Sequence, residues 1–188
     1  MGTIHKPDLV KLIVSVLAGN SGWILEARTA LIQAFGPIDL ESDLLPFDHS
    51  DYYSAEFGPG LQRQFLAFER LISADDLPAI KCQTNELEWS LRAAESTHGK
   101  GQRRVNLDPG YVSMGKLVLA STKDHAHRLY LGQGIYAEVT LTYQRGRFRP
   151  WSWTYPDYAS ERYCDLFAEI RQRYKLQLKE LAAETSAD

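Results

Sequence analysis

DLVKLIVSVLAGNSGWILEARTALIQAF, residues 8–35, carries the strongest indication of a fold class. Residues 8–18 are apolar and rich in β-branched side chains, which is typical of a buried strand. Residues 23–35 place apolar side chains at helical spacing, with Ser21 available as an N-cap and Gly36-Pro37 as a stop signal. The stretch therefore predicts a strand followed directly by a helix.

The next segments extend this unit. Residues 38–47 are predicted to be a strand. Residues 61–72 suit either a strand or a helix, and the strand is favoured because Gly58-Pro59-Gly60 precedes them and helix signals follow directly. Ser73 is followed by two acidic residues and predicts the start of a helix that runs from about 74 to 95. The order βαββα matches the beginning of a ferredoxin-like fold.

Antiparallel strands and a final helix are predicted for the second half of the chain. The expected elements are a strand at 103–107, a turn at Asp108-Pro109-Gly110, a hairpin at 127–143, a short strand at 147–153 and a helix at 159–182. Residues 113–122 suit either a helix capped by Ser113 or a strand, and the helix is slightly favoured. Without a repeat or a linker, we expect one α+β domain over residues 1–183 and a frayed tail over 184–188.

Composition narrows the classes of protein and partner. The 188 residues are 44% hydrophobic and 24% charged, as in ordinary globular proteins, and the net charge of −3 disfavours nucleic acid as a partner. Cys82 and Cys164 are too far apart in sequence for a zinc ribbon or a disulfide framework. The apolar run at residues 9–18 contains Lys11 and is too short to cross a bilayer. A cytoplasmic protein without a membrane partner is expected.

Polar residues with functional chemistry are concentrated between residues 103 and 143. Alternate residues of a strand share a face, so Arg104, Asn106 and Asp108 are expected to converge. A guanidinium suits phosphate or carboxylate, and Asp108 suits a base or a metal ligand. An internal Arg–Asp pair with a turn formed by Asp108 explains the same pattern equally well.

Glu138 lies in the otherwise apolar stretch IYAEVTL, residues 135–141. A buried carboxylate is unfavourable without a partner, so we expect either an ion pair with Arg104, Lys116 or Arg128, or a role as a base or metal ligand. Tyr136 shares the face of Glu138.

Three groups of candidate site residues follow. The candidate catalytic residues are Asp108, His127 and Glu138. The candidate ligand-binding residues are Arg103, Arg104, Asn106, Lys116, Lys123, Arg128 and Tyr136. Asp48 and Asp51 belong to an acidic loop that either is merely solvated or brings oxygen ligands to Mg²⁺, the one cofactor that the sequence indicates.

Several motifs resemble those of one family. They include FDHSDYY at 47–53, RRVNLDPGY at 103–111, KLVLASTKD at 116–124 and HRLYLGQGIYAEVTL at 127–141. Together they cover nearly the whole chain, which is similar to a mainly bacterial family filed as domain of unknown function 4416. The resemblance implies no established activity, and the sequence contains no P-loop, GxSxG, HExxH or CxxC motif.

The favoured hypothesis is a site for an anionic small molecule, phosphorylated or nucleotide-like, that the cluster of Arg, Lys, Asp and Glu residues binds. One alternative is a non-enzymatic interaction protein whose charges form internal ion pairs and whose aromatic segment at 151–158 packs on a partner. The other is an RNA-associated factor with a local basic strip. Catalysis, the identity of the ligand and the oligomeric state stay open at the level of sequence.

Overall fold

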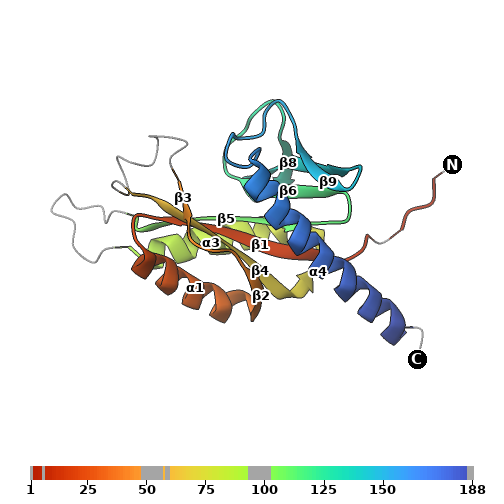
Figure 1. The fold of residues 1–188 in the computed structure, drawn as a ribbon, viewed down its shortest axis with the longest axis horizontal. Coiled ribbons are helices and arrows are strands. Elements are labelled where there is room, and N and C mark those ends of the chain that lie inside the picture. The colour runs from red at the N-terminus through yellow and green to blue at the C-terminus, as the bar shows by residue number, and fades with distance from the viewer. Residues whose placement is uncertain (1, 6, 48–56, 58–59, 93–102, 186–188) are drawn as a thin grey trace.

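The computed structural model describes residues 2–5, 7–47, 57, 60–92 and 103–185. In this part of the chain nine strands form one antiparallel sheet, in the order β2-β4-β1-β5-β6-β8-β7, with β3 paired to β4 and β9 paired to β8 (Figure 1). The elements are β1 (Val10–Ala18), α1 (Ser21–Phe35), β2 (Ile38–Glu41), β3 (Leu45–Pro46), β4 (Gln62–Ile72), α3 (Leu77–Ser90), β5 (Val105–Val112), β6 (Lys116–Ser121), β7 (Leu129–Gly132), β8 (Ile135–Gln144), β9 (Arg147–Pro150) and α4 (Glu161–Thr185).

The predicted α+β class with a ferredoxin-like start is confirmed. β1 lies at the centre of this part of the sheet, between β4 and β5, and its neighbours are antiparallel. Val14 and Val16 pack with Leu31 of α1 on one face, where α3 also lies. Ile13 packs with Phe167 of α4 on the other face, which α4 crosses (Figure 1). Both faces of β1 are therefore buried, which explains its nearly continuous apolar run.

The helix starts follow from local side-chain chemistry. The cap of α1 is Asn20, whose Oδ1 accepts from the backbone N–H of Trp23 at 3.1 Å, so the prediction of Ser21 was wrong by one residue. Gly36 ends α1 at φ 93°, as expected. Ser73 and Asp76 form a capping box around a 3-10 helix, Ala74–Asp76, that leads into α3.

Two predictions about the middle of the chain were wrong. Asp108-Pro109-Gly110 is not a turn, because β5 continues through it and pairs with β1 from Val105 to Val112. Residues 113–122 are not a helix: Ser113 begins a tight turn and β6 follows it. Leu117 and Leu119 pack on the α4 side and Val118 on the α3 side, so burial of both faces hides the alternation that normally reveals a strand.

The late hairpin is confirmed as β7 and β8, joined where Gly132, Gln133 and Gly134 all have positive φ. β9 ends at Pro150, earlier than expected, and α4 continues to Thr185. The tail predicted from residue 184 therefore starts within the helix, and residues 186–188 lie outside the described residues. In the part of the chain that the structure describes, no helix combines the length and the apolar character needed to cross a membrane.

Candidate functional site

A cleft opens where β5 and β6 separate. The two strands pair only between Gly110–Val112 and Leu117–Leu119, although β5 pairs with β1 over its whole length. On the N-terminal side of Gly110 in β5, the two strands diverge around a cleft of about 560 Å³. Its charged and amide-bearing lining residues are Arg63, Lys81, Asn85, Glu88, Arg103, Asn106, Asp108, Lys123, Arg128, Glu138 and Asp157.

The sequence at 107–110 explains the separation. A Cβ on Gly110 would lie 2.3 Å from the carbonyl oxygen of Val118, so the strands are in close contact there. The backbone N–H and C=O of Leu107 bond to side chains of α3 instead of a strand. Alternate residues direct their backbone groups to the same edge, so the nitrogen of Pro109 lies on this edge too, and it has no hydrogen to donate. The edge of β5 therefore cannot continue its ladder with β6.

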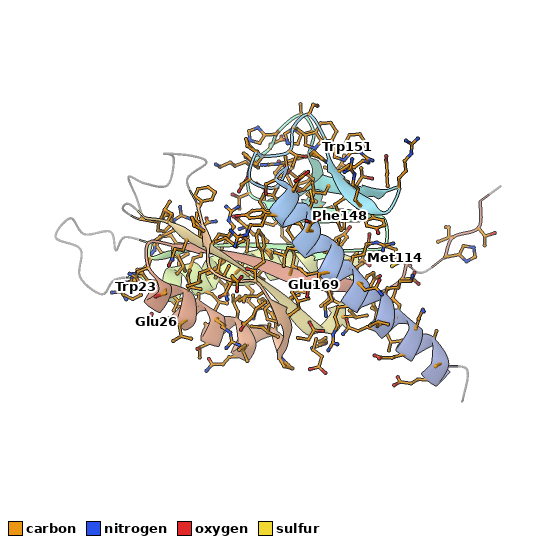
Figure 2. All side chains as sticks on the ribbon, in the orientation of Figure 1. Trp23, Glu26, Met114, Phe148, Trp151 and Glu169 are labelled. Atoms are coloured by element: carbon orange, nitrogen blue, oxygen red, sulfur yellow. The ribbon has the colours of Figure 1, made fainter. Side chains whose placement is uncertain are left out.

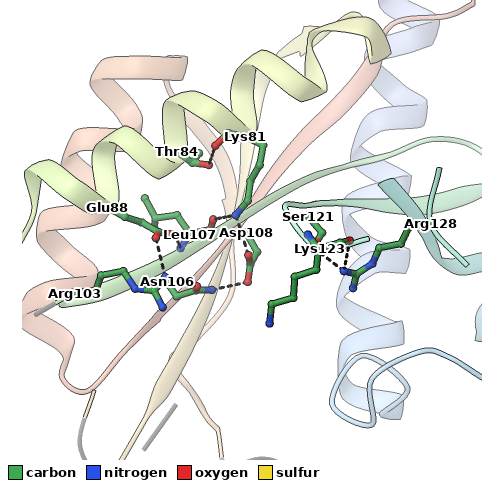
Figure 3. A network of polar contacts seen from close by, with 10 residues as sticks. All are labelled: Lys81, Thr84, Glu88, Arg103, Asn106, Leu107, Asp108, Ser121, Lys123 and Arg128. Carbon is green, nitrogen blue, oxygen red and sulfur yellow. Dashed lines mark hydrogen bonds and ion pairs between the residues drawn. The ribbon is translucent and has the colours of Figure 1, made fainter. Parts of the chain in front are cut away.

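Lys81 and Glu88 of α3 form the first wall of the cleft (Figure 3). Lys81 Nζ donates to the carbonyl oxygen of Leu107 at 2.8 Å and to Asp108 Oδ1 at 3.1 Å. Glu88 Oε1 accepts from the Leu107 N–H at 2.6 Å, and its Oε2 pairs with Arg103 at 3.1 Å. Burial raises the pKa of Glu88, although the charge of Lys81 opposes that shift. Lys81 and Glu88 thus bond the backbone C=O and N–H of Leu107, which a neighbouring strand would bond in a continuous sheet.

Asp108 projects from β5 into the cleft. Its Oδ2 accepts from Asn106 Nδ2 at 2.6 Å, so these two residues share a face as the alternation predicted. The side chain is 32% exposed. Burial acts to raise the pKa of Asp108, but the charges of Lys81 and Arg63 and the hydrogen bonds from Lys81 and Asn106 outweigh it and hold the pKa below its ordinary value. Asp108 is therefore an ionised, positioned acceptor at neutral pH.

Asp108→Asn is expected to lower stability at pH 7 and to lower it less in acid. The folded-state pKa of Asp108 is depressed, so its contribution is present above the unfolded value of about 3.9 and disappears as the pH falls through the folded value. Urea unfolding at pH 7, 5 and 3 measures how much the free energy of unfolding of Asp108→Asn differs from that of the unsubstituted protein. The control is Asp124→Asn, at an exposed position. A difference for Asp108→Asn that stays constant over this range would contradict a role for the charge.

The opposite wall is built by β6, β8 and the segment before β7. Glu138 is 3% exposed, and its Oε2 accepts from Arg128 Nε at 2.8 Å and lies 3.1 Å from His127 Nε2. Thr140 donates to its Oε1 at 3.2 Å. Arg128 also donates to Ser121 Oγ at 2.7 Å and to the carbonyl oxygen of Lys123 at 3.0 Å (Figure 3). Of the three expected partners of Glu138, the structure shows Arg128.

The floor of the cleft contains a buried ion pair between Arg63 of β4 and Asp157. The guanidinium carbon of Arg63 lies 4.5 Å from the ring centroid of Phe47 and 5.3 Å from that of Tyr158. Burial acts to lower the pKa of Arg63, but Tyr158 and Asp157 raise it, and the net pKa lies above its ordinary value. Burial also raises the pKa of Tyr158. The positive charge of Arg63 is thus fixed.

Four charged residues of the cleft were missed from the sequence: Arg63, Lys81, Glu88 and Asp157. A signal exists for three of them. Lys81 and Glu88 lie seven positions apart, two helical turns, among the apolar positions of α3. Arg63 alternates with the buried Phe65 on one face of β4. A charged residue at such a core-facing position needs a partner, which marks it as a candidate.

The predicted site residues fall into four groups. The cleft brings together Arg103, Asn106, Asp108, Lys123, Arg128 and Glu138. His127 contacts Glu138 from outside the lining, and its ring stacks on Trp153 with centroids 5.6 Å apart. Asp48 and Asp51, the expected Mg²⁺ ligands, lie outside the described residues.

The other three predicted residues lie elsewhere, so the prediction that Arg104 converges with Asn106 and Asp108 was wrong. The guanidinium carbon of Arg104 is 3.9 Å from the ring centroid of Trp23. Trp23 belongs to α1. It lies on the opposite side of the molecule from Trp151, which directly follows β9 (Figure 2). Lys116 is exposed at the far end of β6, and Tyr136 packs on Tyr130 at 5.3 Å. Arg103, rather than Arg104, reaches Asn106, with its Nη1 3.5 Å from Asn106 Oδ1.

Residues 8–174 match the family described as domain of unknown function (DUF4416). The chain belongs to this family. The DUF4416 match includes every residue that lines the cleft, from Phe47 to Tyr158. Neither the curated proteins nor the solved structures compared with the chain include a match.

Proposed function

We propose that the cleft between β5 and β6 binds a small phosphorylated molecule. The observation that supports this is the charge of the lining: among the described residues, five cationic side chains face four acidic ones. The cations are Arg63, Lys81, Arg103, Lys123 and Arg128, and the acids are Glu88, Asp108, Glu138 and Asp157. A net positive cleft attracts an anion even though the whole chain carries −3. Its volume of about 560 Å³ lies within the range of roughly 300–1,000 Å³ that is typical of ligand pockets.

The phosphate group is assigned to the wall with Lys123 and Arg128. The backbone of Lys123 is held from both sides, because its N–H donates to Ser121 Oγ at 3.1 Å and its carbonyl oxygen accepts from Arg128. Its side chain extends into the space between the two walls (Figure 3). The Lys123 ammonium and the Arg128 guanidinium both belong to residues that line the cleft, and together they match the charge and the acceptor oxygens of a phosphate.

The three candidate catalytic residues have different positions in this proposal. Asp108 faces the ligand as an ionised acceptor. Glu138 is hydrogen-bonded to His127 and accepts a hydrogen bond from Arg128. In this proposal Glu138 and His127 therefore position the guanidinium of Arg128. Turnover of the ligand stays a prediction, as do the interaction and RNA-associated alternatives.

Thermal shift and calorimetry with inorganic phosphate, pyrophosphate and a panel of phosphorylated metabolites, with and without Mg²⁺, test the proposal. Lys123→Met is expected to weaken binding at least about tenfold, because a hydrogen bond to a charged group contributes roughly 1.5–3 kcal/mol. Lys116→Met is the matched control, an exposed lysine of β6 outside the cleft lining. No stabilisation by any of these compounds, or equal effects of the two substitutions, would refute the assignment. A gel shift with bulk RNA that weakens steeply with salt would support the RNA alternative instead.

A further inference from the structure

We infer that Asp108 and Asn106 form a hydroxyl-binding subsite, so that the ligand of the cleft is a hydroxylated phosphate ester, such as a sugar or polyol phosphate. The inference rests on the proposed function, since it places the phosphate at Lys123 and Arg128 and assigns the facing wall to the remainder of the ligand. One wall belongs to α3 and β5, and the other to β6 with the segment after it, on opposite sides of the opening in the sheet.

The Asp108 carboxylate is held before any ligand arrives. Lys81 donates to its Oδ1 and Asn106 to its Oδ2, which leaves further lone pairs on both oxygens. Lys81 is itself fixed by the carbonyl oxygen of Leu107 at 2.8 Å. A polar group that is positioned by buried neighbours loses little freedom on binding, and 32% of the side chain is exposed to receive a partner.

The neighbouring charges favour a neutral donor at this position. Lys81 Nζ lies 3.1 Å from Asp108 Oδ1, so a ligand ammonium at the carboxylate would face a like charge at short range. A second anionic group of the ligand would be repelled by Asp108 itself. Within the described residues no set of three His, Cys, Asp or Glu side chains is arranged to hold a metal ion. A hydroxyl donates to the carboxylate without adding charge, and it can accept from the Asn106 amide.

Calorimetry with two matched pairs of probes tests the subsite. Glycerol 3-phosphate is compared with propyl phosphate, and ribose 5-phosphate with tetrahydrofurfuryl phosphate, which has the ring and the phosphate without the hydroxyls. At least one hydroxylated probe is expected to bind about tenfold or more tightly than its partner, since the analogue without hydroxyls displaces water from the carboxylate and makes no hydrogen bond in its place. This comparison uses the unsubstituted protein and needs no variant.

Asp108→Asn is expected to reduce that preference to about threefold or less, while binding of propyl phosphate and inorganic phosphate stays the same or strengthens. Asn106→Ala, which keeps the charge, is expected to reduce the preference partially, and Asp124→Asn is expected to leave it unchanged. Equal binding within both pairs, or an undiminished preference in Asp108→Asn, would overturn the subsite and leave phosphate binding in place. Absence of binding by every probe, inorganic phosphate and pyrophosphate included, would overturn the proposed function as well.

Discussion

Asp157→Ala is expected to destabilise the protein by about 3–5 kcal/mol, because it leaves a buried charge without its partner. The side chains of Arg63 and Asp157 are 5% and 6% exposed, and the guanidinium of Arg63 lies among aromatic rings. The charge of Arg63 cannot be removed by deprotonation, since its pKa is raised further above the ordinary value. Loss of the carboxylate therefore leaves unfavourable desolvation uncompensated.

Urea unfolding at pH 7 measures this effect. Glu41→Ala is the control, because the Arg28–Glu41 pair has side chains 33% and 40% exposed, and such pairs contribute about 1 kcal/mol or less. The double variant Arg63→Met with Asp157→Leu is expected to recover most of the stability, since it removes both charges from the floor of the cleft. Similar losses for Asp157→Ala and Glu41→Ala would show that the buried pair has no special energetic role.

Gly110→Ala is expected to destabilise the protein by about 3 kcal/mol, at the upper end of the usual effect of overpacking. The new Cβ would lie 2.3 Å from the carbonyl oxygen of Val118 and 2.7 Å from Leu119 Cδ2. The first contact is with backbone, so relief requires β5 and β6 to move apart at the pairs that close the cleft. The substitution is therefore expected to change the spacing of β5 and β6 at the closed end of the cleft as well as the stability of the protein.

Unfolding measurements combined with amide hydrogen exchange test this prediction. Faster exchange is expected for the amides of Tyr111 and of its partner Val118 in β6, together with weaker binding of phosphorylated probes. Gly115→Ala is the matched control, because a Cβ there meets no atom within 4 Å. Unchanged exchange at the β5–β6 pairs in Gly110→Ala would contradict the close approach at Gly110.

Local sequence signals were sufficient for much of the first half of the fold. The apolar run of β1, the Gly36 stop and the Ser73 capping box each depend on residues close together in the chain. The period of two along a strand likewise placed Asn106 beside Asp108. Such features can be inferred from sequence because neighbouring residues alone generate them.

Contacts between distant segments account for what sequence reasoning missed. Asp108-Pro109-Gly110 has the composition of a turn, but pairing with β1 extends it, and β6 is hidden by burial of both its faces. Lys81 and Glu88 acquire their roles only because Leu107, far along the chain, presents unpaired backbone groups at an opening in the sheet. Arg128 rather than Arg104 or Lys116 pairs with Glu138 because of where the segment before β7 lies against β8. The energy of a buried charge depends on which partner reaches it in space, and spacing along the chain does not contain that information.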